Sequence, residues 1–170
     1  NVVVAYTYDA LNRLTIADYP GTNKDATYLY DTGSGCTAGI RRLCRVSTTT
    51  LTTNYAYNIF GYLTDQTQTQ QGKSYTTHTD RDESGRVTGL TYPGGRSVVY
   101  TQDKRGRITD ISATVNGILT SLVSNRVYRA DHQLSSQTCG NGLVDTRLYT
   151  PYAGRLTYQS IGSIDTRLFA

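Results

Sequence analysis

One ten-residue pattern recurs along this chain, and it constrains the fold more than any other feature. In its first copy, residues 6–15, Asp9 precedes a turn residue, Asn12, which is followed by Arg13, an aliphatic residue and a threonine. The acid position, the turn position and the next residue recur as Asn58, Gly61 and Tyr62; Asp82, Gly85 and Arg86; Asp103, Gly106 and Arg107; and Pro151, Gly154 and Arg155. Degraded copies surround positions 41 and 132, so the spacing is 20 to 29 residues. A repeat of this length indicates stacked copies of one small unit.

Each copy predicts a β-hairpin. Tyr6 and Tyr8 are two residues apart, so both rings project from the same face of an extended strand. An acid at the strand end can accept a hydrogen bond from the backbone two residues on, and Gly or Asn at the turn position tolerates a positive φ. One hairpin cannot bury its apolar face alone. We therefore expect an all-β fold in which antiparallel hairpin repeats join into one spiralling sheet.

Further turns are predicted between the repeats. Asn116-Gly117 separates two apolar runs, which is a strong signal for a two-residue hairpin, and Asn141-Gly142 is expected to make the same turn later. An exposed hairpin loop is expected at residues 71–73. We expect residues 1–170 to form a single repeat segment. Both ends resemble interrupted strands and the chain has no methionine, so we expect a piece of a longer repeat protein.

Composition narrows the class of protein. Fifteen tyrosines against two phenylalanines and no tryptophan suit half-wet sheet surfaces, and sixteen glycines with three prolines suit tight turns. The net charge of +4 suggests a nucleic-acid partner at first sight. The arginines, however, recur because the turn recurs, so no nucleic-acid partner is expected. No stretch reaches the ~18 apolar residues of a membrane helix, so no membrane span is expected.

The three cysteines are an odd count. Cys36 and Cys44 flank an irregular turn, eight residues apart, where a longer loop replaces the usual short one. We expect them to form a disulfide, which would favour an extracellular or periplasmic setting. The alternative is two unpaired thiols buried as small apolar groups.

Catalysis is not expected. His78 is close in sequence to Asp80, Asp82 and Ser84, but these residues belong to one strand-and-turn segment, whereas a triad needs side chains that converge. His78 and Asp80 are expected to share a strand face and to form a solvated pair. The remaining carboxylates are mostly the turn acids, and the cysteines and histidines lack metal-ligand spacing. We therefore predict no enzyme, no cofactor and no metal site.

The pattern Tyr-x-Tyr-Asp-x-x-Gly-Arg-Leu-Thr, as in residues 6–15, 55–64 and 100–109, resembles the RHS or YD repeat. The likeness covers essentially the whole chain; Asn58 and Pro151 stand where Asp is usual, and Asn12 where Gly is usual. The family includes bacterial polymorphic toxins, shell components of insecticidal ABC toxins and the animal teneurins. The resemblance implies a large antiparallel sheet that spirals into a hollow shell around a toxic segment. The Asp-Pro-x-Gly-Trp phrase that closes bacterial shells is absent, so no cleavage residue is assigned.

The function expected from the sequence is structural. The chain would be a non-catalytic segment of a secreted or cell-surface RHS/YD-repeat protein, and its partners would be the rest of its own shell and an enclosed toxin or effector. One alternative is an adhesion module that binds carbohydrate or a cell-surface protein through tyrosine-rich faces. Another is a filament formed by self-association through open strand edges.

Overall fold

The computed structural model describes residues 3–21 and 24–169. These residues form fifteen β-strands, and none of them is helical. Contacts divide the chain into two compact units, unit 1 (residues 1–85 and 91–93) and unit 2 (residues 86–90 and 94–170). Across the described ranges, there is no helix with the length and apolar character needed to cross a membrane.

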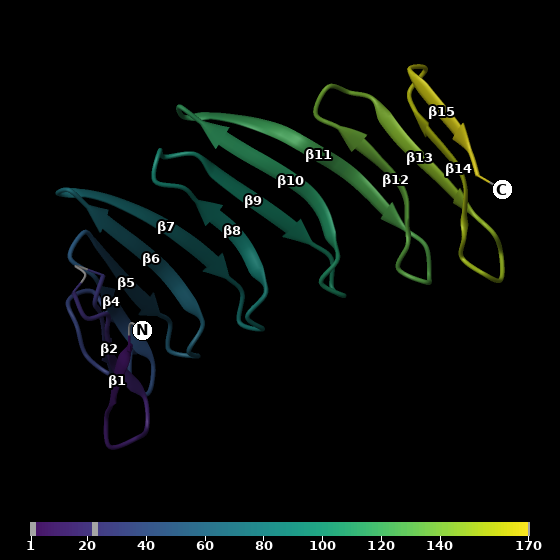
Figure 1. Ribbon diagram of the computed structural model, residues 1–170. Coiled ribbons are helices and arrows are strands. Elements are labelled where there is room, and N and C mark those ends of the chain that lie inside the picture. The colour runs from purple at the N-terminus through teal and green to yellow at the C-terminus, as the bar shows by residue number, and fades with distance from the viewer. Residues whose placement is uncertain (1–2, 22–23, 170) are drawn as a thin grey trace. The chain divides into compact units, whose positions relative to one another are not determined.

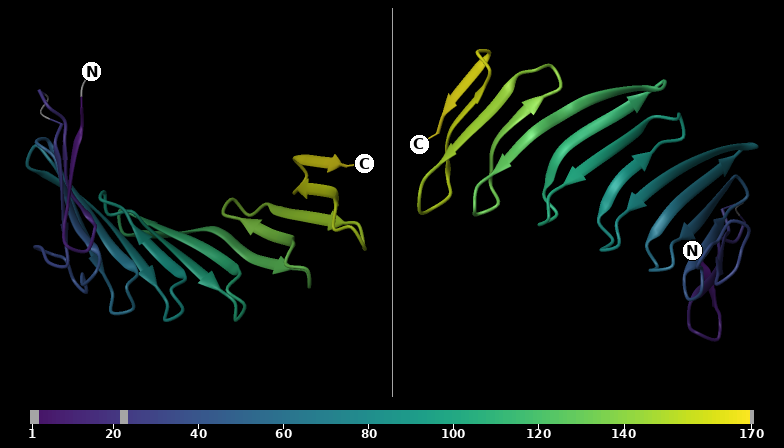
Figure 2. Two further views of the ribbon diagram at one scale, coloured as in Figure 1. Left: turned by 60° about the horizontal axis from the view of Figure 1, so that its bottom comes forward. Right: turned by 180° about the vertical axis from the view of Figure 1, so that it is seen from behind.

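Unit 1 contains β1 (Ala5–Tyr8), β2 (Leu14–Asp18), β3 (Ala26–Tyr30), β4 (Leu43–Ser47), β5 (Leu51–Tyr57), β6 (Leu63–Gln70) and β7 (Lys73–Arg81). Each of these strands pairs antiparallel with the next one in the chain. The longer members, β5, β6 and β7, lie side by side in both views of the ribbon (Figures 1 and 2). The unit is therefore a meander of hairpins.

Unit 2 holds all but one residue of β8 (Val87–Thr91), together with β9 (Ser97–Gln102), β10 (Ile108–Val115), β11 (Ile118–Tyr128), β12 (Leu134–Cys139), β13 (Val144–Tyr149), β14 (Leu156–Ile161) and β15 (Asp165–Leu168). From β9 to β15 the strands again pair antiparallel in chain order. The prediction of an all-β fold built from antiparallel hairpin repeats is confirmed.

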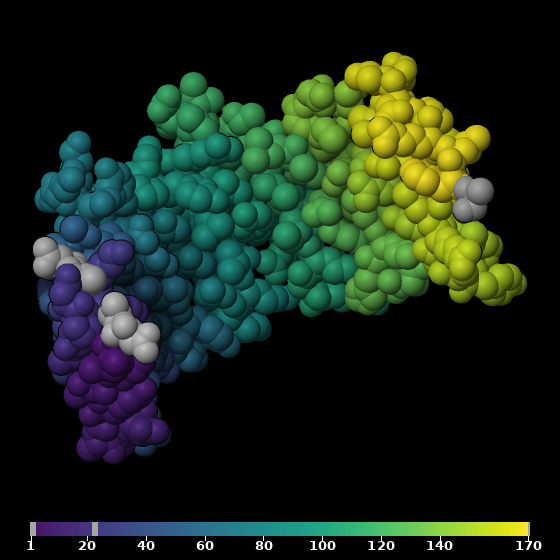
Figure 3. All heavy atoms as spheres, in the orientation of Figure 1, coloured from purple at the N-terminus to yellow at the C-terminus, as the bar shows by residue number. Residues whose placement is uncertain are grey.

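Two-residue turns join the longest strands. Asn116 and Gly117 both have positive φ, 52° and 79°, and connect β10 to β11. Gln71 and Gly72 connect β6 to β7 in the same way, so Lys73 lies in β7 and not in the loop. Paired positive φ values match the twist of the two strands. In the space-filling view the β10–β11 end projects beyond the strands beside it (Figure 3).

The turn at Asn141-Gly142 differs from the expected two-residue hairpin. Only Gly142 has a positive φ, 82°, and its N–H donates to the carbonyl of Cys139. The side chain of Asn141 accepts from the N–H of Leu143. These are features of the longer repeat turn, because β12 ends at Cys139 and β13 begins only at Val144.

The buried side chains of the described residues are mostly small. Ala17, Cys44 and Ala113 are 1–2% exposed, whereas most tyrosines and aliphatic residues are half-buried or exposed. Burial of large apolar groups is therefore a modest source of stability here, since the free energy scales with the apolar area removed from water. Contacts between neighbouring hairpins, above all at their turns, must therefore contribute a larger share of the stability.

Candidate functional site

The predicted turns form a recurring structure that we call the repeat corner, from the acid position to the residue after the turn position: residues 9–13, 58–62, 82–86 and 103–107, with variants ending at 42, 133 and 155. All seven predicted turn positions have positive φ: Asn12 (60°), Arg41 (63°), Gly61 (89°), Gly85 (80°), Gly106 (79°), His132 (68°) and Gly154 (59°). Three of these residues carry a side chain in a backbone region that favours glycine. The corner imposes this conformation whichever residue occupies it.

The acid position closes the corner through its side-chain oxygen. Asp9 Oδ1 accepts from the backbone N–H groups of Leu11 and Arg13, both at 2.9 Å. Asp103 and Asn58 accept two N–H groups each at the matching positions. The amide oxygen of Asn58 therefore replaces the carboxylate in this role. Asp82 accepts from the N–H of Ser84 at 2.9 Å.

In the variant corners, other side chains accept the backbone N–H groups of the turn. Where Pro151 stands in place of the acid, the corner is one residue longer, and the hydroxyl of Thr150 accepts from the N–H of Arg155 at 3.0 Å. Asp31 accepts from the N–H of Arg41 across the long turn. At the corner of His132, Asp131 accepts from the N–H of Gln133 at 3.2 Å. Backbone closure is therefore general, although the residue that provides it changes.

The arginine after the turn position pairs with the acid. Arg13 Nε lies 2.7 Å from Asp9 Oδ2, and Arg107 makes the same contact with Asp103. The N–H of Arg13, and then its guanidinium, hold the pKa of Asp9 below its ordinary value; Arg107 acts in the same order on the pKa of Asp103. Arg13 also bridges to Asp31 of the next hairpin at 2.7 Å. These carboxylates are engaged in structure.

The same arginine reaches the next repeat. Guanidinium groups lie over the ring of the tyrosine that ends the following hairpin's first strand: Arg13 over Tyr30 (4.4 Å), Arg42 over Tyr57 (5.6 Å) and Arg107 over Tyr128 (4.8 Å). At the corner of Gly61 the two residue types are exchanged, and Arg81 lies over Tyr62 at 5.6 Å. The stacked pair is retained although its members have changed places.

From the corner at Gly61 onward, a hydrogen bond, which we call the tie, links each corner to the one before it. In it, the last side chain of a strand donates to the carbonyl of the first residue of the preceding strand. The ties are Tyr57 Oη to Leu43 (2.7 Å), Arg81 Nε to Leu63 (3.4 Å), Gln102 Nε2 to Val87 (2.7 Å), Tyr128 Oη to Ile108 (2.7 Å) and Tyr149 Oη to Leu134 (2.8 Å). Successive corners are therefore fastened in register, whichever side chain provides the donor.

The recurring glycine has a second cause besides its φ. A Cβ on Gly61 would lie 2.0 Å from the guanidinium of Arg42, and one on Gly85 would lie 2.3 Å from the ring of Tyr62. Gly106 receives Arg86 in the same manner, with a Cβ-to-nitrogen distance of 2.8 Å. The residue after one turn position therefore packs against the next turn position. A row of glycines lets the corners stack.

The threonine that completes the repeat lies at a β-bulge. Its hydroxyl donates to a carbonyl on the paired strand, as in Thr15 to Thr7 (3.0 Å), Thr64 to Ala56 (3.3 Å), Thr109 to Thr101 (3.3 Å), Ser135 to Val127 (3.0 Å) and Thr157 to Leu148 (3.2 Å). The pairing register shifts by one residue at each of these places. The hydroxyl thus donates a hydrogen bond to a backbone carbonyl at the place where the bulge interrupts the regular hydrogen-bond ladder of the sheet.

Cys44 occupies this threonine position in the second repeat, and it is joined to Cys36 by a disulfide. The link closes the irregular turn between β3 and β4. Thr37, inside the turn, donates its hydroxyl to the carbonyl of Tyr57 at 2.8 Å, and its own carbonyl accepts from the N–H of Tyr57. The long turn is therefore attached to the end of β5. Cys139 is a free thiol.

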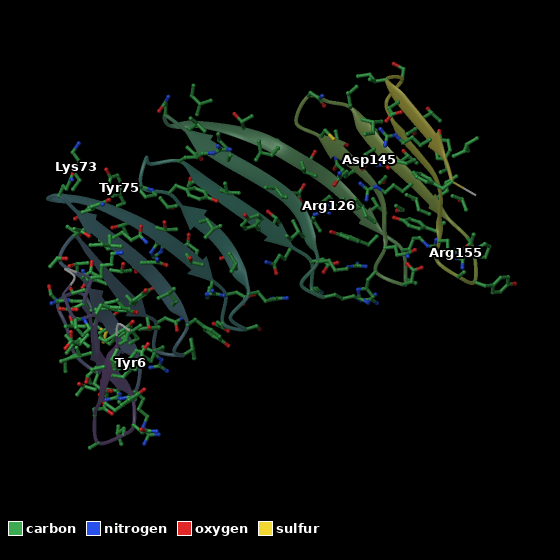
Figure 4. All side chains as sticks on the ribbon, viewed as in Figure 1. Tyr6, Lys73, Tyr75, Arg126, Asp145 and Arg155 are labelled. Atoms are coloured by element: carbon green, nitrogen blue, oxygen red, sulfur yellow. A yellow bond between two sulfur atoms is a disulfide. The ribbon has the colours of Figure 1, made fainter. Side chains whose placement is uncertain are left out.

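The remaining predicted residues take different positions. Arg155 is exposed and lies at the β13–β14 corner (Figure 4). His78 lies between two carboxylates, with Nδ1 2.6 Å from Asp65 and Nε2 3.2 Å from Asp80. The hydrogen bond with Asp65 is the main cause that raises the pKa of His78. Sequence reasoning paired His78 with Asp80 but missed Asp65, because Asp65 faces it across the β6–β7 pair.

A buried cluster around Asp145 had no sequence signal. The side chain of Asp145 in β13 is 4% exposed and pairs with Arg147 at 2.7 Å. Gln137 and Gln159, from the strands on either side, donate to the same carboxylate at 3.2 and 3.1 Å. Burial alone would raise the pKa of Asp145, but the hydrogen bonds from Arg147 and the glutamines outweigh it and lower the pKa. The cluster holds three strands in register. Within the described ranges, no group of three His, Cys, Asp or Glu side chains is arranged so that it could hold a metal ion.

Comparison with known proteins supports the fold. No family model matches this sequence, and no curated protein matches it. Among solved structures, a crystal structure of TcdB2-TccC3 matches with a TM-score of 0.80 at 16% identity over 99% of this chain. A TcdB2-TccC3-Cdc42 crystal structure gives 0.78 at 17% identity, and the Photorhabdus luminescens Tc holotoxin pore gives 0.76 at 16% identity, each over 95% of the chain. The chain spans 9–10% of the length of those chains. The chain therefore has an RHS-like β-fold, which it shares with part of these toxin complexes.

Proposed function

We propose that this chain is a structural, non-catalytic segment of an RHS/YD-repeat shell that encloses or displays a toxin or effector. The observation that carries the proposal is the row of ties between corners. The donors of these ties are three tyrosines, one arginine and one glutamine, and each tie fastens one hairpin to the hairpin before it. A residue pattern whose contacts fasten one hairpin to the next is suited to extending a sheet. The likeness in fold to TcdB2-TccC3 supports the same assignment.

The chemistry of the corners supports a non-catalytic role. Asp9, Asp31 and Asp103 are hydrogen-bonded to arginine and to backbone N–H groups, and these contacts lower their pKa values. A catalytic acid or base needs a pKa near the working pH and access to substrate. The lowered pKa values of these carboxylates move them away from that range.

A secreted or surface location is part of the proposal. The disulfide between Cys36 and Cys44 supports it, because such links persist mainly in oxidising compartments. The partners would be the neighbouring segments of the same shell and the material that the shell encloses.

Limited proteolysis of the complete gene product tests this role. We would compare the native protein with a variant in which Tyr128→Phe and Tyr149→Phe remove two ties. A shell segment predicts that weakening these corners also exposes cleavage sites elsewhere in the gene product, because the shell is breached. New cleavage confined to residues 1–170 would contradict the shell and would favour an independent module.

A further inference from the structure

The two faces of the β6–β7 hairpin differ in how their polar side chains are satisfied. On one face the cross-strand partners bond to each other: Thr67 with Thr76 at 2.8 Å, Thr69 with Ser74 at 2.9 Å, and Asp65 with His78 at 2.6 Å. Each of these pairs is directly opposed in the sheet. This face therefore uses its own hydrogen-bonding groups.

On the opposite face, the polar side chains do not bond to their cross-strand partners. Gln66 opposes Thr77, and Gln68 opposes Tyr75. Within the described part of the chain, the side chains of these four residues have no hydrogen-bond partner. Each glutamine amide offers two donors and an acceptor in one plane. The face therefore presents a set of unused, closely spaced donors and acceptors.

These residues line a hollow of about 240 Å³. The lining adds Leu63, Thr64, Thr79 and Pro93 to the four residues already named, and all eight belong to unit 1. Tyr75 is 48% exposed and lies towards the turn end of β7 (Figure 4). Pockets for drug-sized ligands measure about 300–1,000 Å³. This hollow is somewhat smaller, which suits a ligand of one or two rings.

The lining carries no ionisable group other than the tyrosine hydroxyl. A charged ligand would lose water here without gaining an opposite charge, which is costly. A purely apolar ligand would cover the amides of Gln66 and Gln68 and leave them unsatisfied. The ligand must therefore be neutral and rich in groups that both donate and accept hydrogen bonds, with an apolar side for the ring of Tyr75.

We propose that this hollow binds a neutral sugar ring. Vicinal hydroxyls of a sugar can donate to the amide oxygen and accept from the amide N–H of Gln66 or Gln68. The C–H face of a sugar can pack on the exposed ring of Tyr75, whose edge and face suit partly apolar contacts. The site is independent of the shell proposal, because a shell can carry it on either surface.

Side-chain amide resonances provide a direct test. We would titrate the ¹⁵N-labelled chain with glucose, galactose, N-acetylglucosamine, maltose and cellobiose, and follow the NH₂ signals of Gln66 and Gln68. At least one neutral sugar is expected to shift these signals saturably, whereas glucose-6-phosphate and glucuronic acid bind more weakly. A better response to methyl glycosides than to free sugars would indicate a chain-end residue of a glycan as the natural source.

Matched variants locate the site. Gln66→Ala, Gln68→Ala and Tyr75→Ala are each expected to weaken sugar binding about tenfold, the equivalent of one lost hydrogen bond or stacking contact. Gln70→Ala, one step along the same face but outside the hollow, and Tyr6→Ala, an exposed tyrosine of β1, should leave binding unchanged. The proposal is overturned if no neutral sugar shifts the signals of the folded chain, or if binding survives the three site variants.

Discussion

Each position of the repeat corner meets more than one constraint at once. Glycine supplies a positive φ and leaves room for the side chain of the preceding corner. Arginine neutralises the acid of its own corner and stacks on the tyrosine of the next. A change at one position should therefore disturb two hairpins.

Gly85→Ala isolates the glycine requirement. Alanine at a φ of 80° costs about 1–2 kcal/mol, and its Cβ would also lie 2.3 Å from the ring of Tyr62. We expect a loss of at least ~1.5 kcal/mol in the free energy of unfolding measured in urea. Gly95→Ala is the matched control, because Gly95 has a φ of 78° but a Cβ there meets no atom within 4 Å. Equal losses in the two variants would refute the packing argument.

His78 gives a pH dependence with a defined sign. Its pKa is raised in the folded state by Asp65, so its stabilising contribution is complete below the unfolded pKa, about 6.5, and is lost as the pH rises through the higher folded value. An NMR titration should give a midpoint for His78 above ~6.5 that falls in Asp65→Asn. An unchanged midpoint in Asp65→Asn would show that His78 and Asp65 do not form an ion pair.

At the scale of the elements, the corner ties connect hairpins that the backbone ladder alone would leave free to slip. Register in a sheet is weakly specified where both faces are polar. Here the ties and the bulge hydroxyls fix the register at one end of the strands that carry them. The network around Asp145 adds a fixed point within β12, β13 and β14.

The exchanged pair in unit 1 tests whether stacking between corners matters more than residue order. Tyr62→Arg and Arg81→Tyr each place like residue types together. Tyr62→Arg should cost about 1 kcal/mol, the usual size of a cation–π contact, and Arg81→Tyr should cost more, because Arg81 also donates to the carbonyls of Leu63 and Gly85. The double variant restores the arrangement of Arg42 and Tyr57 and should regain most of the loss. Strictly additive losses in this double-mutant cycle would contradict the coupling.

Two copies of the same four residues, Asp-Thr-Arg-Leu at 145–148 and 165–168, provide an internal control for burial. Asp145→Asn should cost about 3 kcal/mol at pH 7, because it breaks a buried pair. Asp165→Asn, whose ion pair with Arg167 is exposed, should cost less than ~1 kcal/mol.

The cost of Asp145→Asn should also depend on pH. The pKa of Asp145 is lowered in the folded state, so its contribution is present above the unfolded value of 3.8 and is lost as the pH falls through the folded value. Urea unfolding between pH 2.5 and 7 measures this difference. A cost that does not shrink in acid would show that the charge of Asp145 is not the source.

At the scale of the whole molecule, the sequence was sufficient for the fold class and for the seven turn positions, because both depend on local spacing. It was not sufficient for the contacts across strands. The partner of His78 depends on how β6 pairs with β7, and the exchange of Tyr62 with Arg81 is visible only once adjacent corners are side by side. The sugar-sized hollow likewise arises from register, since the glutamines alone resemble an ordinary exposed strand.

The most direct test of the account removes only the oxygen atoms of two ties in unit 2. Tyr128→Phe with Tyr149→Phe keeps both rings and deletes the hydroxyls that donate to Ile108 and Leu134. Each lost hydrogen bond is worth about 1 kcal/mol, so the free energy of unfolding in urea should fall by about 2 kcal/mol, whereas Tyr6→Phe, an exposed tyrosine of β1, should have no effect. A double variant as stable as the native chain would contradict the claim that corner ties hold the hairpins together.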